Sequence, residues 1–321
     1  MAQFLSNLPV GAKVKFGSIY NQPIVWLVAA KNHAGYPSGA ITLVTERIIK
    51  LMCVDAKEPS NSNRGRKDYG NNRHIHSNIL QWLNSPAGAG QWYQPQHAAD
   101  APPSSANVWN KHNPYDQQAG FLNAFSANER EAILETTLTV VKSTTDGGGS
   151  ETFKSKVFLL STTEVGLANE SGIAEGSRLA MFTTDNGSRL CYPTAAAVAN
   201  SDYSSSSLAV DKAWFWWLRT PYASDAHHVR DVYSDGSLDN SHACNGHGGL
   251  RPALNLPSSI LVSDTTDADG CYTIILWTPP DMVFDINNVK KAYDNGWCKV
   301  NGTLRQIDKV WTKINGVLRE V

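Results

Sequence analysis

Short apolar stretches separated by turn-forming residues open the chain. Residues 13–19, 24–29 and 41–45 are rich in β-branched side chains, and Asn, Pro and Gly stand between them. β-branched residues favour strands, whereas Asn, Pro and Gly favour the turns that join strands. The pattern therefore predicts an opening set of three antiparallel strands.

Two later segments begin with the signals that start a helix. Ser77 stands before the apolar residues of 79–83, and Ser126 with Glu129 forms a capping box before residues 133–134. A serine at this position accepts a hydrogen bond from a backbone N–H group that the helix leaves unpaired. We therefore predict two helices that pack on the sheet, and hence an α+β fold.

The C-terminal segment carries one short pattern twice. Residues 297–307, WCKVNGTLRQI, recur as residues 311–321, WTKINGVLREV. Asn-Gly supplies the two positive φ angles of a type I′ turn, so each copy is predicted to form a β-hairpin. Because an isolated hairpin is only marginally stable, it needs a partner surface. We expect a main domain of residues 1–280 and a hairpin module of residues 281–321 that serves attachment or assembly; the alternative is a β-meander that only caps the domain.

Composition and charge exclude two classes of partner. The chain is 41% hydrophobic, enough for a substantial core, and its net charge of −1 and pI of about 6.7 come without a basic cluster beyond residues 64–67. A nucleic-acid ligand is therefore not expected. The most apolar stretch, residues 24–30, is too short to span a bilayer, and residues 1–14 lack the pattern of a signal peptide. We expect a soluble product without membrane insertion.

Sequence signatures of catalysis are missing. The chain has no GxSxG, no HExxH, no P-loop and no dinucleotide fingerprint, so we predict no catalytic residues and no enzymatic activity. The five cysteines are widely spaced, odd in number and without a CxxC pair, which does not imply structural disulfides.

A polar window covers residues 222–247, YASDAHHVRDVYSDGSLDNSHACNGH. Its 26 residues are rich in Tyr, Asp, His, Ser and Asn and contain no Lys, Glu, Gln, Met or Trp. Changes at the first two adenines of an Asn codon (AAC or AAT) yield the enriched types but cannot yield the five absent ones. The composition therefore indicates adenine-directed mutation; the alternative is chance in a polar loop region.

The segments around this window carry a resemblance to a known family. They are WFWWLRTP at 214–221, SDGSL at 234–238, GGLRPALNL at 248–256, and, earlier, SNILQWLN at 77–84 and VFLLSTTEVG at 157–166. Their order resembles the variable region of C-type lectin-like proteins that a diversity-generating retroelement rewrites, and the resemblance covers most of residues 10–277. In that family, adenine mutagenesis alters codons near the C-terminus of a ligand-binding domain, usually in a phage receptor-binding protein or a bacterial surface protein.

This resemblance implies a fold, a function and partners. The fold would be C-type lectin-like, with small antiparallel sheets and two main helices, followed by the C-terminal hairpin module. The function would be receptor binding by a phage or prophage tail protein, made in the bacterial cytoplasm and located in the virion. The partners would be a protein or glycan receptor on a cell surface and, through the C-terminal hairpins, phage tail components; a homo-oligomer is compatible with this role.

The hypervariable region would cover about residues 214–256 and contain both a binding surface and its support. Tyr supplies rigid contact area, and Ser, Asn, Asp and His supply adaptable hydrogen bonds, as in antibody paratopes. The predicted ligand-binding residues, expected to be mostly exposed on one face, are Tyr222, Asp225, His227, His228, Asp231, Tyr233, Asp239, Asn240, Ser241, His242, Asn245 and His247. The predicted core residues, here called the frame, are Trp214, Phe215, Trp216, Trp217, Leu218, Leu250, Ala253, Leu254 and Leu256.

Two other functional interpretations remain. The frame is also similar to the formylglycine-generating oxidase, which uses paired reactive cysteines, but only Cys244 lies in the candidate site here, and two adenine changes in an Asn codon also give Cys. A structural tail protein without a diversified ligand is the third interpretation.

Metal binding has two sequence candidates, and neither is favoured. His227, His228, His242 and His247 could ligate zinc or nickel if a hairpin brought them together, but their spacing fits no standard site, and adenine mutation predicts the same histidine enrichment. Asp264, Asp267 and Asp269 do not have the ligand spacing of an EF-hand loop, and Asp269-Gly270 is predicted to form a turn. We therefore predict no metal and no cofactor.

Overall fold

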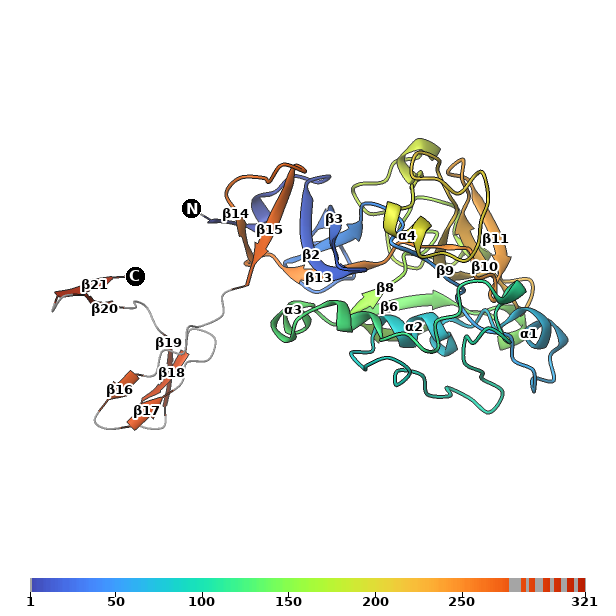
Figure 1. The fold of residues 1–321 in the computed structure, drawn as a ribbon, viewed down its shortest axis with the longest axis horizontal. Helices are drawn as coiled ribbons and strands as arrows, with labels where there is room; N and C mark the ends of the chain where they lie inside the picture. Colours follow the sequence, from blue (N-terminus) through green and yellow to red (C-terminus); the bar gives the residue numbers. More distant parts are fainter. Residues whose placement is uncertain are drawn as a thin grey trace. The chain divides into compact units, whose positions relative to one another are not determined.

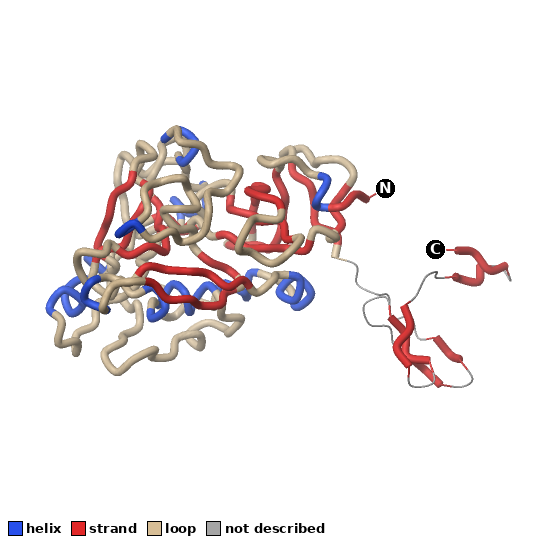
Figure 2. The backbone as a smooth tube through the Cα atoms, turned by 180° about the vertical axis from the view of Figure 1, so that it is seen from behind, coloured by secondary structure: helices blue, strands red, loops and turns tan. Residues whose placement is uncertain are grey.

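The computed structural model describes residues 2–276 continuously and six strands beyond them. The chain divides into two compact units, residues 1–276 and 277–321 (Figure 1). Within the first unit, β2, β3, β14 and β15 lie at one end and β10 and β11 at the other. Figure 2 shows that long loops connect these strands.

An eight-stranded sheet pairs strands from the beginning and the end of the first unit's sequence. In spatial order its strands are β1 (Ala2–Phe4), β14 (Leu261–Ser263), β15 (Cys271–Ile275), β2 (Lys13–Ile19), β3 (Gln22–Lys31), β4 (Ala40–Thr45), β13 (Ala253–Pro257) and β8 (Val157–Phe158). The three predicted opening strands are β2, β3 and β4, and their antiparallel pairing is confirmed. The predicted turn at Asp269-Gly270 is also present, with Gly270 at a φ of 74°.

A five-stranded sheet carries the polar window. Its spatial order is β11 (Leu238–His242), β10 (His228–Val232), β9 (Trp216–Pro221), β12 (Gly249–Leu250) and β5 (Lys50–Leu51). A separate two-stranded sheet pairs β6 (Thr136–Val141) with β7 (Ser150–Ser155). The window therefore lies at one edge of the sheet, next to the frame strand β9.

Helices are few and short, which corrects the predicted fold. Between residues 2 and 276 the α-helices are α1 (Arg64–Tyr69), α2 (Asn78–Leu83), α3 (Ala127–Ala132) and α4 (Ala195–Ala199), against fifteen strands, and among the described residues no helix could cross a membrane. Short 3-10 turns are η1 (Leu5–Asn7), η2 (His74–His76), η3 (Trp109–Lys111), η4 (Phe121–Ala124), η5 (Thr144–Asp146), η6 (Glu170–Gly172) and η7 (Asn186–Arg189). The predicted fold with two main helices is wrong, because this unit is mostly β-sheet and its helices are short; a mixed α+β composition remains compatible with it.

The predicted helix starts are confirmed, although neither segment forms a main helix. Ser77 accepts a hydrogen bond from Leu80 N–H, and Ser126 forms its capping box with Glu129. Neither helix exceeds six residues. After α3 the backbone becomes extended at Ile133, and the next N–H group, on Leu134, donates to the β13 backbone at 2.9 Å. Pairing with the sheet thus ends the helix, and a capping signal carries no information about that event.

The described residues of the second unit form three strand pairs. They are β16 (Phe284–Ile286) with β17 (Val289–Lys291), β18 (Trp297–Val300) with β19 (Thr303–Gln306), and β20 (Trp311–Ile314) with β21 (Val317–Glu320), all antiparallel. The last two pairs are the predicted repeated hairpins. Their Asn-Gly turns, at residues 301–302 and 315–316, lie outside the described residues.

The frame forms a tightly packed core. Trp216, Trp217 and Leu218 are completely buried, and each of the other predicted frame residues is at most 9% exposed. The indole N–H groups of Trp216 and Trp217 donate to the backbone oxygens of Arg189 and Met52, at 3.0 and 2.8 Å. Since a buried indole needs a hydrogen-bond acceptor, these contacts fix both the depth and the direction of β9.

A buried ion pair joins β9 to three other segments. The Arg219 guanidinium contacts both carboxylate oxygens of Glu164, at 2.6 and 2.9 Å, and also donates to the backbone oxygens of Thr139, Leu159 and Glu175. Both side chains are almost completely buried. The motifs WFWWLRTP and VFLLSTTEVG therefore meet in space, which explains why they occur together in this chain.

Frame and window substitutions should differ in their cost to stability. Trp217→Ala is expected to lower the free energy of unfolding by about 3–5 kcal/mol, because it removes a fully buried indole and its hydrogen bond. Tyr233→Ala, in a side chain that is 47% exposed, should change it by less than about 0.5 kcal/mol. Urea denaturation of both variants measures the difference, and equal losses would contradict the separation of frame from window.

Truncation tests the division into two units. A chain ending at Leu276 keeps every strand of the eight- and five-stranded sheets, so its melting temperature should match that of the full chain within a few degrees. Its association state, measured by light scattering, should change if residues 277–321 serve assembly. Loss of the cooperative melting transition would instead make those residues part of the main fold.

Candidate ligand-binding surface

The polar window folds as one edge hairpin with its flanking loops. It comprises the turn after β9, the strands β10 and β11, the connection between them, and the loop that follows β11. In the β10–β11 pairing His228 faces His242, and Asp231 faces Asp239. Side chains on β11 therefore occupy the outer edge of the sheet, whereas β10 lies between β9 and β11.

The exposure of the twelve predicted binding residues is lower than expected. Tyr233 and Asp239 are exposed, Asp231 is buried, and nine are partly buried: Tyr222, Asp225, His227, His228, Asn240, Ser241, His242, Asn245 and His247. Many of these side chains pack against one another and against aromatic residues of α1 and η3. Partial burial of this kind leaves atoms available to a ligand while restricting side-chain motion.

Asp231 was predicted to be an exposed binding residue, and this is wrong. Its side chain is only 1% exposed, because β10 is an inner strand and its register against β9 shifts between Val229 and Asp231. This irregularity breaks the usual alternation, so that Asp231 and Val232 are both buried. Burial raises the pKa of the Asp231 carboxyl to about 7, and the Ser241 side chain offsets part of that increase.

A pocket of about 360 Å³ brings four predicted binding residues together with two frame residues. The four are Tyr233, Ser241, Asn245 and His247, and the frame residues are Trp214 and Phe215. The other lining residues are Ser207, Ala213 and Ser234. The pocket thus combines aromatic surface with hydroxyl and amide groups, which is the composition of sites that hold a polar ligand by stacking and hydrogen bonds.

Two contacts keep the aromatic side of the pocket in place. The indole N–H of Trp214 donates to the His247 backbone oxygen at 2.8 Å. The His247 ring stacks on Tyr203, with 4.2 Å between ring centroids and 11° between ring planes. Tyr203 and Ser207 belong to the serine-rich segment at 201–208, which we did not single out in the sequence; its run of small polar residues was the only available signal.

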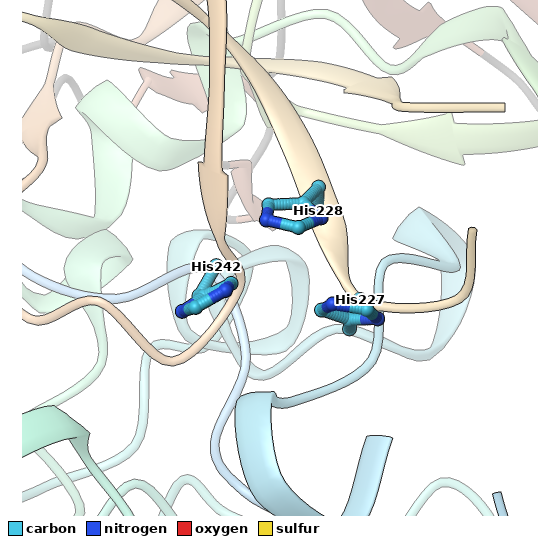
Figure 3. A group of neighbouring side chains, drawn as sticks. All are labelled: His227, His228 and His242. Carbon is cyan, nitrogen blue, oxygen red and sulfur yellow. The ribbon is translucent and has the colours of Figure 1, made fainter. Parts of the chain in front are cut away.

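A second group, the histidine cluster, lies where β10 begins and β11 ends. One ring nitrogen from each of His227, His228 and His242 lies within 4.8 Å of the others (Figure 3). Figure 3 shows the three rings converging from the start of β10 and the end of β11. His247, the fourth histidine considered from the sequence, belongs to the pocket instead.

Asp225 and Tyr69 hold the histidine cluster. The Asp225 carboxylate accepts hydrogen bonds from the N–H groups of His227 and His228, both at 2.9 Å, and lies 2.6 Å from His228 Nδ1. Tyr69, the last residue of α1, stacks on His242 with 4.1 Å between ring centroids. Burial, followed by the neighbouring His228 and His227, lowers the pKa of His242 to about 4, so this imidazole is neutral at pH 7.

Besides the buried Asp231, three predicted binding residues belong to neither group. The Tyr222 ring lies under the Arg230 guanidinium, 4.5 Å from it, and Arg230 in turn pairs with Glu170 at 2.6 Å. Asp239 and Asn240 lie on β11 opposite Asp231 and Arg230. These three side chains are partly or fully exposed and add to the polar surface of the window.

The four cysteines within residues 2–276 do not resemble a reactive pair. Cys53, Cys191, Cys244 and Cys271 are buried and free. Burial raises the pKa of the Cys244 thiol to about 12, and burial together with the neighbouring Cys244 raises the pKa of Cys53. Both thiols are therefore protonated at neutral pH, whereas a nucleophilic cysteine needs its thiolate form.

The raised pKa of Asp231 predicts a pH-dependent stability. The folded pKa, about 7, exceeds the unfolded value near 4, so the folded state holds a proton that the unfolded state has lost. The contribution of this carboxyl is thus most favourable below about pH 4 and is lost as the pH rises to 7. Asp231→Asn should flatten the fall in unfolding free energy between pH 4 and 7, as measured by urea denaturation. An unchanged pH profile would show that Asp231 does not titrate in this way.

Comparison with known proteins identifies a family. None of the curated proteins and none of the solved structures compared with the chain matches it. The model of one family, described as "Domain of unknown function (DUF6273)", matches residues 39–258, about two thirds of the chain. The matched range contains the whole five-stranded sheet, the polar window and the Arg219–Glu164 pair. The chain therefore belongs to the DUF6273 family.

Proposed function

We propose that this protein binds a protein or glycan ligand through the surface of its polar window, and that adenine mutagenesis by a retroelement diversifies this surface. The observation that carries the proposal is the contrast between an inner strand and the edge strand of the five-stranded sheet. On β9, Trp216, Trp217 and Leu218 are completely buried, whereas every residue of the edge strand β11 is at least partly exposed. Substitution at the edge alters what a ligand meets without removing the packing that holds the sheet.

The chemistry of the pocket supports a ligand of mixed polarity. Trp214, Phe215 and His247 offer ring surfaces, and Ser241 and Asn245 offer hydrogen-bonding groups. Rigid aromatic area combined with short polar side chains suits both sugar rings and polar peptide segments, because it costs little conformational entropy on binding. The exposed Tyr233 at the rim adds a large amphipathic contact.

Glycine positions at which the fold tolerates no side chain have codons that adenine mutagenesis does not change. Trp and Gly codons carry no adenine in their first two positions, so mutagenesis directed at those adenines leaves them unchanged. Gly236 and Gly246 lie inside the window, and an added Cβ would stand 2.1 Å from the Asn186 oxygen or 1.9 Å from the His112 oxygen, both backbone atoms. Such contacts would force the backbone apart. The residues that tolerate no side chain are thus of a type that this mechanism does not alter.

On this proposal the protein acts as a receptor-binding protein of a phage or prophage tail. Its partner is a protein or glycan receptor on a cell surface. The repeated hairpins of residues 281–321 supply attachment to tail components or to further copies of the chain. The support for this placement is the resemblance of the segments around the window to retroelement-diversified variable proteins.

Binding experiments with pocket variants test whether the surface of the polar window binds a ligand. Fluorescently labelled full-length protein is screened against a glycan array and against intact bacterial cells. The double substitution Tyr233→Ala with Asn245→Ala should weaken binding to any captured ligand at least about tenfold, because truncation of central contacts often costs 2 kcal/mol or more. Its melting temperature should stay within a few degrees of the parent value.

Asp211→Ala supplies the matched control, since Asp211 is exposed and lies outside both the window and the pocket lining. This variant should bind as the parent does. If the double variant binds as tightly as the parent and the control, the ligand uses another surface and the proposed site is wrong.

A further inference from the structure

We propose that His227, His228 and His242 form a binding site for a divalent first-row transition metal, with Zn²⁺ as the best-suited ion. The sequence spacing argued against a standard site because two of these residues are adjacent and the third is distant. The β10–β11 register brings the distant residue close, because His228 and His242 are direct partners across the two strands. Partners in antiparallel strands project their side chains to the same face, and His227 enters that face from the turn just before β10.

The distances are close to those of a metal site. The three ring nitrogens lie within 4.8 Å of one another. Nitrogen ligands on tetrahedral zinc, each about 2.0–2.1 Å from the ion, stand roughly 3.4 Å apart. Small rotations of the imidazoles therefore bring three donors onto one ion. All three side chains are partly buried, so solvent access and limited freedom are both available for this adjustment.

Asp225 orients the His228 ring before a metal binds. Its carboxylate lies 2.6 Å from Nδ1 of His228, which leaves Nε2 of that ring as the free donor. Carboxylate–histidine pairs of this kind fix the tautomer and raise the basicity of a metal-binding imidazole. The same carboxylate holds the backbone N–H groups of His227 and His228, so one residue orients two of the three donors.

The walls of the site restrict the other two rings. Tyr69 stacks on His242 and on His227, with 4.1 and 5.1 Å between ring centroids. His227 also lies directly over α1, where a Cβ added at Gly65 would stand 2.5 Å from His227 Nδ1. Gly65 therefore permits the position of a ring that the cluster requires.

Three imidazole ligands leave the fourth tetrahedral position to water or to a donor from another molecule. Imidazole donors suit Zn²⁺, Cu²⁺ and Ni²⁺ and disfavour Mg²⁺ and Ca²⁺, which prefer oxygen ligands. The inference concerns the side chains present in this chain and does not rest on the proposed function, because metal binding can be measured without any other ligand.

Zn²⁺ titration by calorimetry tests the site in the metal-stripped, full-length protein, and Co²⁺ absorption reports the ligand geometry. One ion should bind per chain with a Kd at or below the micromolar range. His227→Asn, His228→Asn and His242→Asn should each weaken binding at least tenfold. Asp225→Asn should weaken it about 10- to 100-fold without removing a donor. Gly65→Ala should also weaken it, by displacing His227.

His33→Ala is the matched control, because His33 is partly buried but lies outside the cluster, beside Ser177. It should bind Zn²⁺ as the parent does, and melting curves without metal check that every variant is folded. Failure of the parent to bind stoichiometric Zn²⁺ at 100 µM (a concentration about 100-fold above a micromolar Kd) overturns the inference. Unchanged affinity in a folded variant lacking all three histidines also overturns it. Ligand screens are repeated with a chelator, so that ligand binding is measured without metal. A failure of the metal site can then be told apart from a failure of the proposed function.

Discussion

The buried pair of Arg219 and Glu164 is the interaction on which the rest of this structure depends. It joins β9 to the segment after β8, and the same guanidinium reaches β6 and the backbone at Glu175. Leaving one member of such a pair without its partner typically costs 3–5 kcal/mol, so the four segments are held in one arrangement. Tyr36 donates to Glu164 at 2.6 Å and connects this arrangement to the eight-stranded sheet side of the unit.

The position of the polar window depends on the Arg219–Glu164 ion pair. β9 is fixed by Arg219 and by the two indole hydrogen bonds, β10 pairs with β9, and β11 pairs only with β10. Packing constraints therefore decrease from β9 to β11, while the number of accessible polar side chains increases. The same hairpin therefore contributes residues to both the pocket and the histidine cluster, while the side chains of β9 stay buried.

Local patterns predicted the elements that local interactions decide. The strands β2 to β4, the serine caps of α2 and α3, the buried frame and the C-terminal strand pairs could all be inferred from the sequence. Helix length could not, because α3 ends where Leu134 pairs with β13, far away in the chain. The burial of Asp231 and the meeting of His228 with His242 depend on strand register, and no short-range pattern encodes a register shift.

Sequencing the DNA beside the gene tests the central claim, a fixed frame carrying a diversified surface, most directly. We expect a near-copy of the DNA segment that encodes residues 214–256. Differences from the gene should occur only at adenines of that copy and should fall in codons of residues 222–247. The codons of Trp216, Trp217 and Arg219 should be identical in both. Absence of such a copy, or differences spread over the frame codons, would contradict the account.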